Sequence, residues 1–185
     1  MPKVAVLVGS LRRESINRRF AEALAGLAEG QLEFDFVDLS DLPHYNDDLW
    51  SDLPAAVTRL KQAVAEADAV LFVTPEYNRN YAPVLGDALH WGSRPYGKSD
   101  WPGKPAAIVG TTPGATGTAA GQQALRQLAL ASQLNLMIAP EVYWTFRPAD
   151  FDGSTVTDPQ ARAFLSGWVD AFAAHIARQR RVLAA

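Results

Sequence analysis

Three continuous apolar runs along the chain limit its fold more than any other feature. They are Val4–Val8, Ala69–Val73 and Ala106–Val109. The sequence of a strand is a continuous apolar run when helices cover both of its faces, because neither face then meets water. Segments with helical spacing separate these runs, and strands that alternate with helices predict an α/β fold with a parallel sheet.

Two further segments have the character of outer strands. Leu32–Phe36 alternates strictly between apolar and polar residues, so one of its faces should meet water, and Leu136–Ala139 could close the opposite side of the sheet. With three inner and two outer strands numbered along the chain, the simplest right-handed arrangement is 2-1-3-4-5, the flavodoxin-like order. The predicted fold is a three-layer sandwich, a five-stranded parallel sheet with helices on both faces.

Apolar side chains repeat every three or four residues in three segments, which are therefore predicted to be helices packed on the sheet. The repeats are Ile16, Phe20, Leu24 and Leu27, then Val57, Leu60 and Val64, and finally Phe164, Trp168, Phe172 and Ile176. The aromatic residues of the last segment are therefore assigned to packing and not to a site.

Composition excludes several classes of function. The chain has 185 residues, which suits one domain over residues 1–185, and no cysteine, which excludes disulfides, thiolate catalysis and cysteine-ligated zinc or iron–sulfur centres. A net charge of −3 argues against general nucleic-acid binding. The cations Arg178, Arg180 and Arg181 are more simply explained as the favourable end of a helix.

The chain opens with Met1-Pro2-Lys3 and a strand too short to be a signal peptide or a membrane span. A soluble cytoplasmic protein is therefore expected.

A polar loop follows the first apolar run. In a sheet of the predicted order, ligands bind outside the carboxyl ends of the strands, where the order reverses between the first and third strands. There the free N–H groups and the positive dipole end of a helix attract an anion, and Ser10, Arg12, Ser15 and Asn17 would add donors. The loop lacks G-x-G-x-x-G and the Lys-Ser/Thr of a P-loop, so it suits a single phosphate. Equally, Ser15 could merely cap the helix and Arg12 could be a surface charge.

Two more loops converge on the same edge. Thr74–Pro83 is bracketed by prolines, and its remaining N–H groups suit contact with a planar, hydrogen-bonding ring, although a plain turn with aromatic packing explains it as well. Gly110–Gly121 is rich in small residues, which let a flat ligand or a backbone approach closely. Taken alone, that second loop is better explained as a flexible connection.

Several motifs in these loops resemble the NADPH-dependent FMN reductase family, which includes quinone, azo-dye and chromate reductases of flavodoxin-like fold. The resemblance extends from about Lys3 to Glu141. It rests on Gly9-Ser10-Leu11-Arg12 with Ser15 and Asn17, on Leu42–Asp48, on Pro75-Glu76-Tyr77-Asn78, on Trp91–Pro95, and on Pro113-Gly114 with Leu125-Arg126-Gln127.

The resemblance implies a set of cofactor-binding positions and no catalytic or metal-ligating side chain. Ser10, Arg12, Ser15 and Asn17, with Ile16 beside them, would hold the FMN phosphate; Pro75, Glu76, Tyr77 and Asn78 would border the flavin ring; and Thr112 and Gly114 would flank it. His44, His90 and His175 lack ligand spacing and are interpreted as surface or packing residues. Glu76 is interpreted as a ring-edge contact and not as a general base.

The implied activity is an FMN-dependent oxidoreductase. NADPH or NADH would give a hydride to the flavin as a transient co-substrate, and a quinone, azo compound, chromate or free flavin would then take two electrons. One alternative is a flavodoxin-like electron carrier without NAD(P)H oxidation, although such carriers are usually more acidic. A hydrolase that uses Ser10 would lack the G-x-S-x-G elbow and a positioned histidine.

Many aromatic residues fall near the expected site, and a neighbouring subunit could complete the pocket there. The aromatic residues are Tyr77, Tyr81, Trp91, Tyr96, Trp101, Tyr143, Trp144 and Phe146. The family's dimers and tetramers favour a homodimer or homotetramer, while core packing explains Trp91 equally well.

Overall fold

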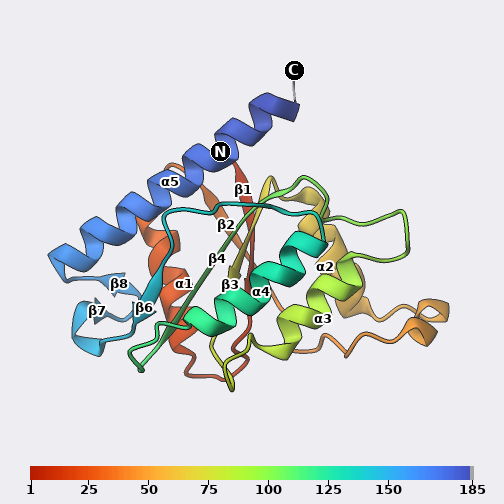
Figure 1. Ribbon diagram of the computed structural model, residues 1–185, viewed down its shortest axis with the longest axis horizontal. Helices are drawn as coiled ribbons and strands as arrows, with labels where there is room; N and C mark the ends of the chain where they lie inside the picture. The colour runs from red at the N-terminus through yellow and green to blue at the C-terminus, as the bar shows by residue number, and fades with distance from the viewer. Residues whose placement is uncertain (184–185) are drawn as a thin grey trace.

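The computed structural model describes residues 1–183 and has a parallel sheet at its centre (Figure 1). The strands are β1 (Lys3–Val8), β2 (Glu33–Val37), β3 (Ala69–Val73), β4 (Pro105–Thr112) and β5 (Asn135–Leu136). Their order is β2-β1-β3-β4-β5, and a further strand, β6 (Tyr143–Thr145), pairs with the end of β4. All of these pairs are parallel, so the predicted order and the predicted direction are confirmed.

Helices cover both faces of the sheet. Figure 1 shows α1 (Ile16–Leu27) and α5 (Pro159–Leu183) on one face, and α2 (Ala55–Glu66), α3 (Pro83–Gly92) and α4 (Ala119–Ala131) on the other. Two separate apolar clusters fill the spaces between the layers. The side chains of β3 are fully buried because both faces of this strand meet helices. The three-layer sandwich is therefore confirmed.

The last outer strand differs from the prediction. A strand was expected over Leu136–Ala139, but β5 ends at Leu136, and Ile138 is 79% exposed. The chain returns to β4 only at β6. Pro140 lies in the gap, and because proline has no N–H it cannot donate to a neighbouring strand. This edge of the sheet is thus built from two short pieces.

The last helix differs in one residue. Trp168, Phe172 and Ile176 are buried as predicted, but Phe164 is half-exposed near the beginning of α5. Its ring stacks on Trp144 from β6, with 5.9 Å between the ring centroids. The prediction of core packing is therefore wrong for Phe164, which lies at the rim of the core.

Smaller elements complete the chain. They are the 3-10 helices Asp47–Ser51 and Pro148–Asp150 and the antiparallel pair β7 (Phe151–Asp152) and β8 (Thr155–Val156). Near the end of α5, Arg180 pairs with Asp68 at 3.6 Å; the side chain of Arg181 and residues 184–185 lie outside the described part. Within residues 1–183, no helix combines the length and the apolar character needed to cross a bilayer.

Candidate functional site

The loop after β1 presents a helix start with free donors. Ser15 caps α1, because its Oγ accepts a hydrogen bond from the N–H of Arg18 at 3.1 Å. The N–H groups of Ile16 and Asn17 have no partner among the described residues, so they are available to an anion. Capping by Ser15, one of the two interpretations of this residue, is thus observed, and it leaves the anion site open.

A hollow of about 230 Å³ lies beside this helix start. Ser10 and Arg12 line it from the β1 side, and Arg18 lines it from α1. Asp38, at the end of β2, also lines it. The N–H of Ser40 donates to Asp38 Oδ1 at 2.9 Å, and this bond holds the pKa of the Asp38 carboxyl below its ordinary value. The hollow therefore combines two arginines with one ionised carboxylate.

A second hollow, of about 430 Å³, lies where the strand order reverses between β1 and β3. Arg12 lines this hollow as well as the first, so the two hollows are neighbours. Tyr77 lines it from the loop after β3, so the predicted loops after β1 and β3 meet at this hollow. Its lining is Gly9, Leu11, Arg12, Leu42, His44, Tyr77, Pro83, Val84 and Asp87.

Asn17 has a structural contact that the sequence did not reveal. Its side-chain amide donates to the carbonyl of Thr111 at 2.9 Å, and its Oδ1 accepts from the N–H of Thr111 at 3.0 Å. Both groups are buried in this pair, so the Asn17 side chain ties the start of α1 to β4. What this residue offers an anion is its backbone N–H.

The loop after β3 is a tight turn anchored by Glu76. Tyr77 and Asn80 exchange two backbone hydrogen bonds, and the two residues between them have left-handed backbone conformations. Glu76 is only 8% exposed and accepts a hydrogen bond from the N–H of Gly121, in the first turn of α4, at 3.1 Å. Arg79 donates to its other carboxylate oxygen, also at 3.1 Å. Glu76 therefore fixes the position of the turn against α4.

Thr112 and Gly114 lie at the end of β4 and line neither hollow. Thr112 Oγ1 accepts a hydrogen bond from the Gly114 N–H at 3.3 Å. The small residues of this loop make room for backbone: a Cβ at Gly117 would clash with the carbonyl group of Tyr143. Small residues were expected to let either a flat ligand or a backbone segment approach. The contacts in the structure support the second reason.

The hollows thus bring together only some of the predicted residues. Ser10, Arg12 and Tyr77 line them. The other predicted positions do not line these hollows; they are Ser15, Ile16, Asn17, Pro75, Glu76, Asn78, Thr112 and Gly114.

The residues that sequence reasoning missed come from the loop after β2 and from α3. They include Leu42, His44 and Asp87. The predicted strand order contained a signal for the first two, because it places the carboxyl end of β2 beside that of β1.

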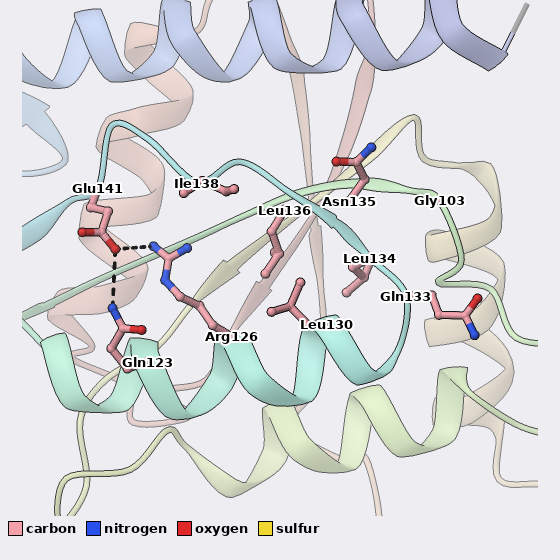
Figure 2. A pocket seen from close by; sticks show the side chains of 10 residues that line it. All are labelled: Gly103, Gln123, Arg126, Leu130, Gln133, Leu134, Asn135, Leu136, Ile138 and Glu141. Atoms are coloured by element: carbon pink, nitrogen blue, oxygen red, sulfur yellow. Dashed lines mark hydrogen bonds and ion pairs between the residues drawn. The ribbon is translucent and has the colours of Figure 1, made fainter.

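A hollow of about 640 Å³ lies elsewhere. Figure 2 shows it between α4 and the chain that follows β5, with Leu130, Leu134 and Leu136 along its length. At one end Arg126 Nη2 pairs with Glu141 at 3.2 Å. No predicted site residue lines it, and it faces the outer edge of the sheet and not the ends of β1 and β3. The predicted site residues that line a hollow therefore line the smaller ones.

Aromatic residues near the site divide into two groups. Trp91 and Trp101 are fully buried, and their indole N–H groups donate to the carbonyls of Pro43 and Leu89, both at 2.9 Å. These two belong to the core. Tyr77, Tyr96 and Tyr143 are exposed, and Tyr96 is 95% exposed.

Comparison with known proteins identifies the family of the chain. The sequence model of the NADPH-dependent FMN reductase family matches residues 2–150. The chain belongs to this family. It is 46% identical over 181 residues to a 2-hydroxy-1,4-benzoquinone reductase of Burkholderia sp, covering 97% of this chain and 98% of the relative. It is 43% identical over 180 residues to a quinone reductase of Pseudomonas putida, covering 97% of each.

A solved relative has the same fold throughout. It is FerB from Paracoccus denitrificans, a flavoenzyme NAD(P)H:(acceptor) oxidoreductase. The TM-score is 0.95 at 45% identity, and the match covers 97% of this chain and 99% of FerB. As a member of the NADPH-dependent FMN reductase family, the chain is an oxidoreductase that uses FMN and NAD(P)H.

The residues present fit FMN. A single phosphate matches the two unpartnered N–H groups at the start of α1 and the guanidinium of Arg12. Arg12 also lines the adjoining larger hollow, whose lining includes Tyr77. The smaller hollow therefore offers the cofactor a charged region, and the larger hollow offers it a less polar one.

Proposed function

We propose that this chain is an NAD(P)H-dependent quinone reductase whose FMN lies across the two hollows. The phosphate would bind at the start of α1, with Ser10, Arg12 and the N–H groups of Ile16 and Asn17 around it. The flavin ring would lie in the larger hollow against Tyr77. The observation that carries the proposal is that Arg12 borders both hollows, so one ligand can span them.

Bound FMN supplies the hydride chemistry, and the protein supplies binding and orientation. The turn after β3 has a fixed shape, because Glu76 holds it to α4, and it keeps the N–H groups of Glu76, Asn78 and Arg79 without partners among the described residues. These donors suit the polar edge of a flavin ring. Pro75, Thr112 and Gly114 do not line the larger hollow, so they would meet the ring only where it extends beyond that hollow.

A quinone is the acceptor that we favour. Relatives that match almost the whole chain are named as benzoquinone and quinone reductases. The larger hollow also has apolar walls, Leu11, Leu42 and Val84, beside polar groups from three loops. A small planar ring with two carbonyl oxygens meets both kinds of surface there.

The test begins with the protein freed of flavin. It should bind FMN much more tightly than riboflavin, which lacks the phosphate, when both are titrated by quenching of flavin fluorescence. NADPH or NADH should then bleach the flavin absorbance without oxygen, and 1,4-benzoquinone should restore it. Failure to take up FMN, or equal affinity for riboflavin, would contradict the proposed site. Bleaching that the quinone does not reverse would contradict the acceptor.

We also propose that residues 1–185 act as one domain, in the cytoplasm, as part of a homodimer or homotetramer. Exposed Tyr77 and Tyr96 support association, because large exposed side chains of this kind are enriched at interfaces between subunits. Tyr77 lines the larger hollow, so a partner covering it would also enclose the flavin.

A further inference from the structure

His44 and Asp87 form an oriented pair at the site. His44 Nδ1 lies 2.8 Å from Asp87 Oδ2, and Asp87 Oδ1 accepts a hydrogen bond from the N–H of Tyr45 at 3.0 Å. The Asp87 side chain is only 14% exposed, whereas that of His44 is 91% exposed. The carboxylate is thus held by α3 and by the loop after β2, and it fixes the ring that it bonds.

The pair lines the larger hollow together with Arg12 and Tyr77. Its position therefore coincides with the place proposed for the flavin ring and the acceptor. Because Asp87 occupies Nδ1, the other ring nitrogen of His44, Nε2, is left without a partner among the described residues. An imidazole held by a carboxylate at one nitrogen and free at the other is the usual arrangement of a histidine that transfers protons.

Quinone reduction consumes a proton that such a group can supply. Conversion of a quinone to its hydroquinone adds a hydride equivalent and one further proton. Without a proton donor, the second oxygen would carry a full negative charge in a partly enclosed site.

We propose that His44 is the proton donor to the quinone acceptor and that Asp87 is its positioning residue. This inference rests on the proposed function. The Nε2–H bond of the imidazolium breaks, a new O–H bond forms on the quinone oxygen, and the imidazole is left neutral. Solvent then restores the proton, since the ring is almost fully exposed.

Charged and titratable groups surround the pair on several elements. Arg12 approaches from the loop after β1, and Tyr77 from the loop after β3. On α3, His90 borders an adjacent hollow of about 290 Å³ that also includes His44 and Asp87. Its ring meets that of Tyr45 edge-on, with 6.2 Å between centroids. His90 does not line the larger hollow, which makes it a matched control.

The decisive experiment compares two acceptors. Benzoquinone requires protons, whereas ferricyanide takes single electrons and no proton. In His44→Gln the ratio of quinone to ferricyanide turnover should fall about 100-fold relative to the unchanged protein, through kcat more than KM. Asp87→Asn should lower the same ratio by a smaller factor, and His90→Gln should leave it unchanged. High salt throughout limits the effect of the altered charge on the ferricyanide anion.

A second measurement does not depend on turnover. The ¹⁵N signals of the His44 ring, recorded without flavin, should report a proton on Nδ1 when the ring is neutral. In Asp87→Asn, a larger fraction of the neutral His44 rings should carry the proton on Nε2 instead of Nδ1. The FMN affinity of each variant, measured by fluorescence, shows whether the flavin site is damaged. An unchanged affinity means that a lower ratio comes from the lost proton donor.

The outcomes are distinct. If the unchanged protein binds FMN but does not reduce benzoquinone, the proposed acceptor is wrong. If it reduces benzoquinone and His44→Gln keeps the ratio, or loses both acceptors equally, the proton-donor role is wrong and the pair only clamps the loop after β2 to α3. A fall in the ratio of His90→Gln equal to that of His44→Gln would overturn the assignment to His44.

Discussion

Glu76 and Asp87 each hold a loop in place through one carboxylate. Glu76 joins the turn after β3 to α4, and Asp87 joins the loop after β2 to α3. Both accept backbone N–H groups while largely shielded from water, where such bonds are stronger than at the surface. Each residue therefore shapes the site mainly by positioning other residues.

Arg12 is the residue whose charge should matter most for the cofactor. Arg12→Ala should weaken FMN binding about 10- to 100-fold, the usual effect of losing a hydrogen bond between charged groups. Arg13→Ala is the matched control, because Arg13 is also exposed but lines neither hollow. Fluorescence titration of the two variants measures the difference. Equal affinities would remove Arg12 from the phosphate site.

Asp38 should give a small, pH-dependent contribution to stability. Its pKa is lowered in the folded protein by the Ser40 N–H, so the ionised form stabilises the fold above the unfolded value of 3.8. This contribution is lost as the pH falls through the lower folded pKa. Asp38→Asn should therefore reduce the free energy of unfolding by about 0.5 kcal/mol at pH 7, a small value because the group is exposed.

Urea unfolding at pH 7 and at pH 3 measures this effect of Asp38. The difference in the free energy of unfolding between the unchanged protein and Asp38→Asn should be smaller at pH 3 than at pH 7. A difference that is the same at both pH values would mean that the charge of Asp38 plays no part.

At the scale of the elements, one amide ties the start of α1 to the end of β4. Asn17→Ala would leave the buried N–H and carbonyl of Thr111 without partners, so it should lower the free energy of unfolding by about 2–4 kcal/mol. Chemical denaturation measures the loss. Gln123→Ala removes an exposed amide from α4 and should change stability by less than about 0.5 kcal/mol.

FMN affinity gives the complementary test for Asn17. Reduced affinity with unchanged stability would assign its side chain to the ligand and contradict the structural role.

The helices illustrate what local patterns can predict. Phe20 and Leu24 are buried as their spacing required, and Ser15 caps α1 as its type suggested. Asn17 was assigned to an anion because it lies at a helix start. Its actual partner, Thr111, is 94 residues away, and no local pattern contains that pairing. Phe164 has helical spacing too, but it lies where α5 reaches the rim of the core.

At the scale of the whole molecule, the sheet order was predictable because burial separates inner from outer strands. β1 and β3 are buried throughout or nearly so, and the order that follows places the site at their carboxyl ends. Three loops were selected on that basis. The loop after β2 contributed Leu42–Asp48 to the family resemblance, but none of its residues was assigned to the cofactor, and His44 was interpreted as a surface or packing residue. Its role depends on Asp87, which only the folded chain brings near.

Association of the molecule should be visible in solution. Exposed apolar side chains occur at several places, among them Tyr96, Leu130 and Ile138, and such surfaces favour contact with another protein. Light scattering at micromolar concentration should therefore give the mass of a dimer or tetramer, with or without FMN. A monomeric mass would contradict a pocket shared between subunits.

The split outer edge of the sheet has a consequence for how copies of the chain can meet. β5 and β6 offer only two and three residues for pairing, and Pro140 interrupts the segment between them. A second sheet therefore finds no continuous row of free N–H and carbonyl groups to extend. Copies that met at this edge would therefore have to join through side chains, which can be matched to one partner. Open-ended strand addition, the first step of fibrous aggregation, has no template on this side.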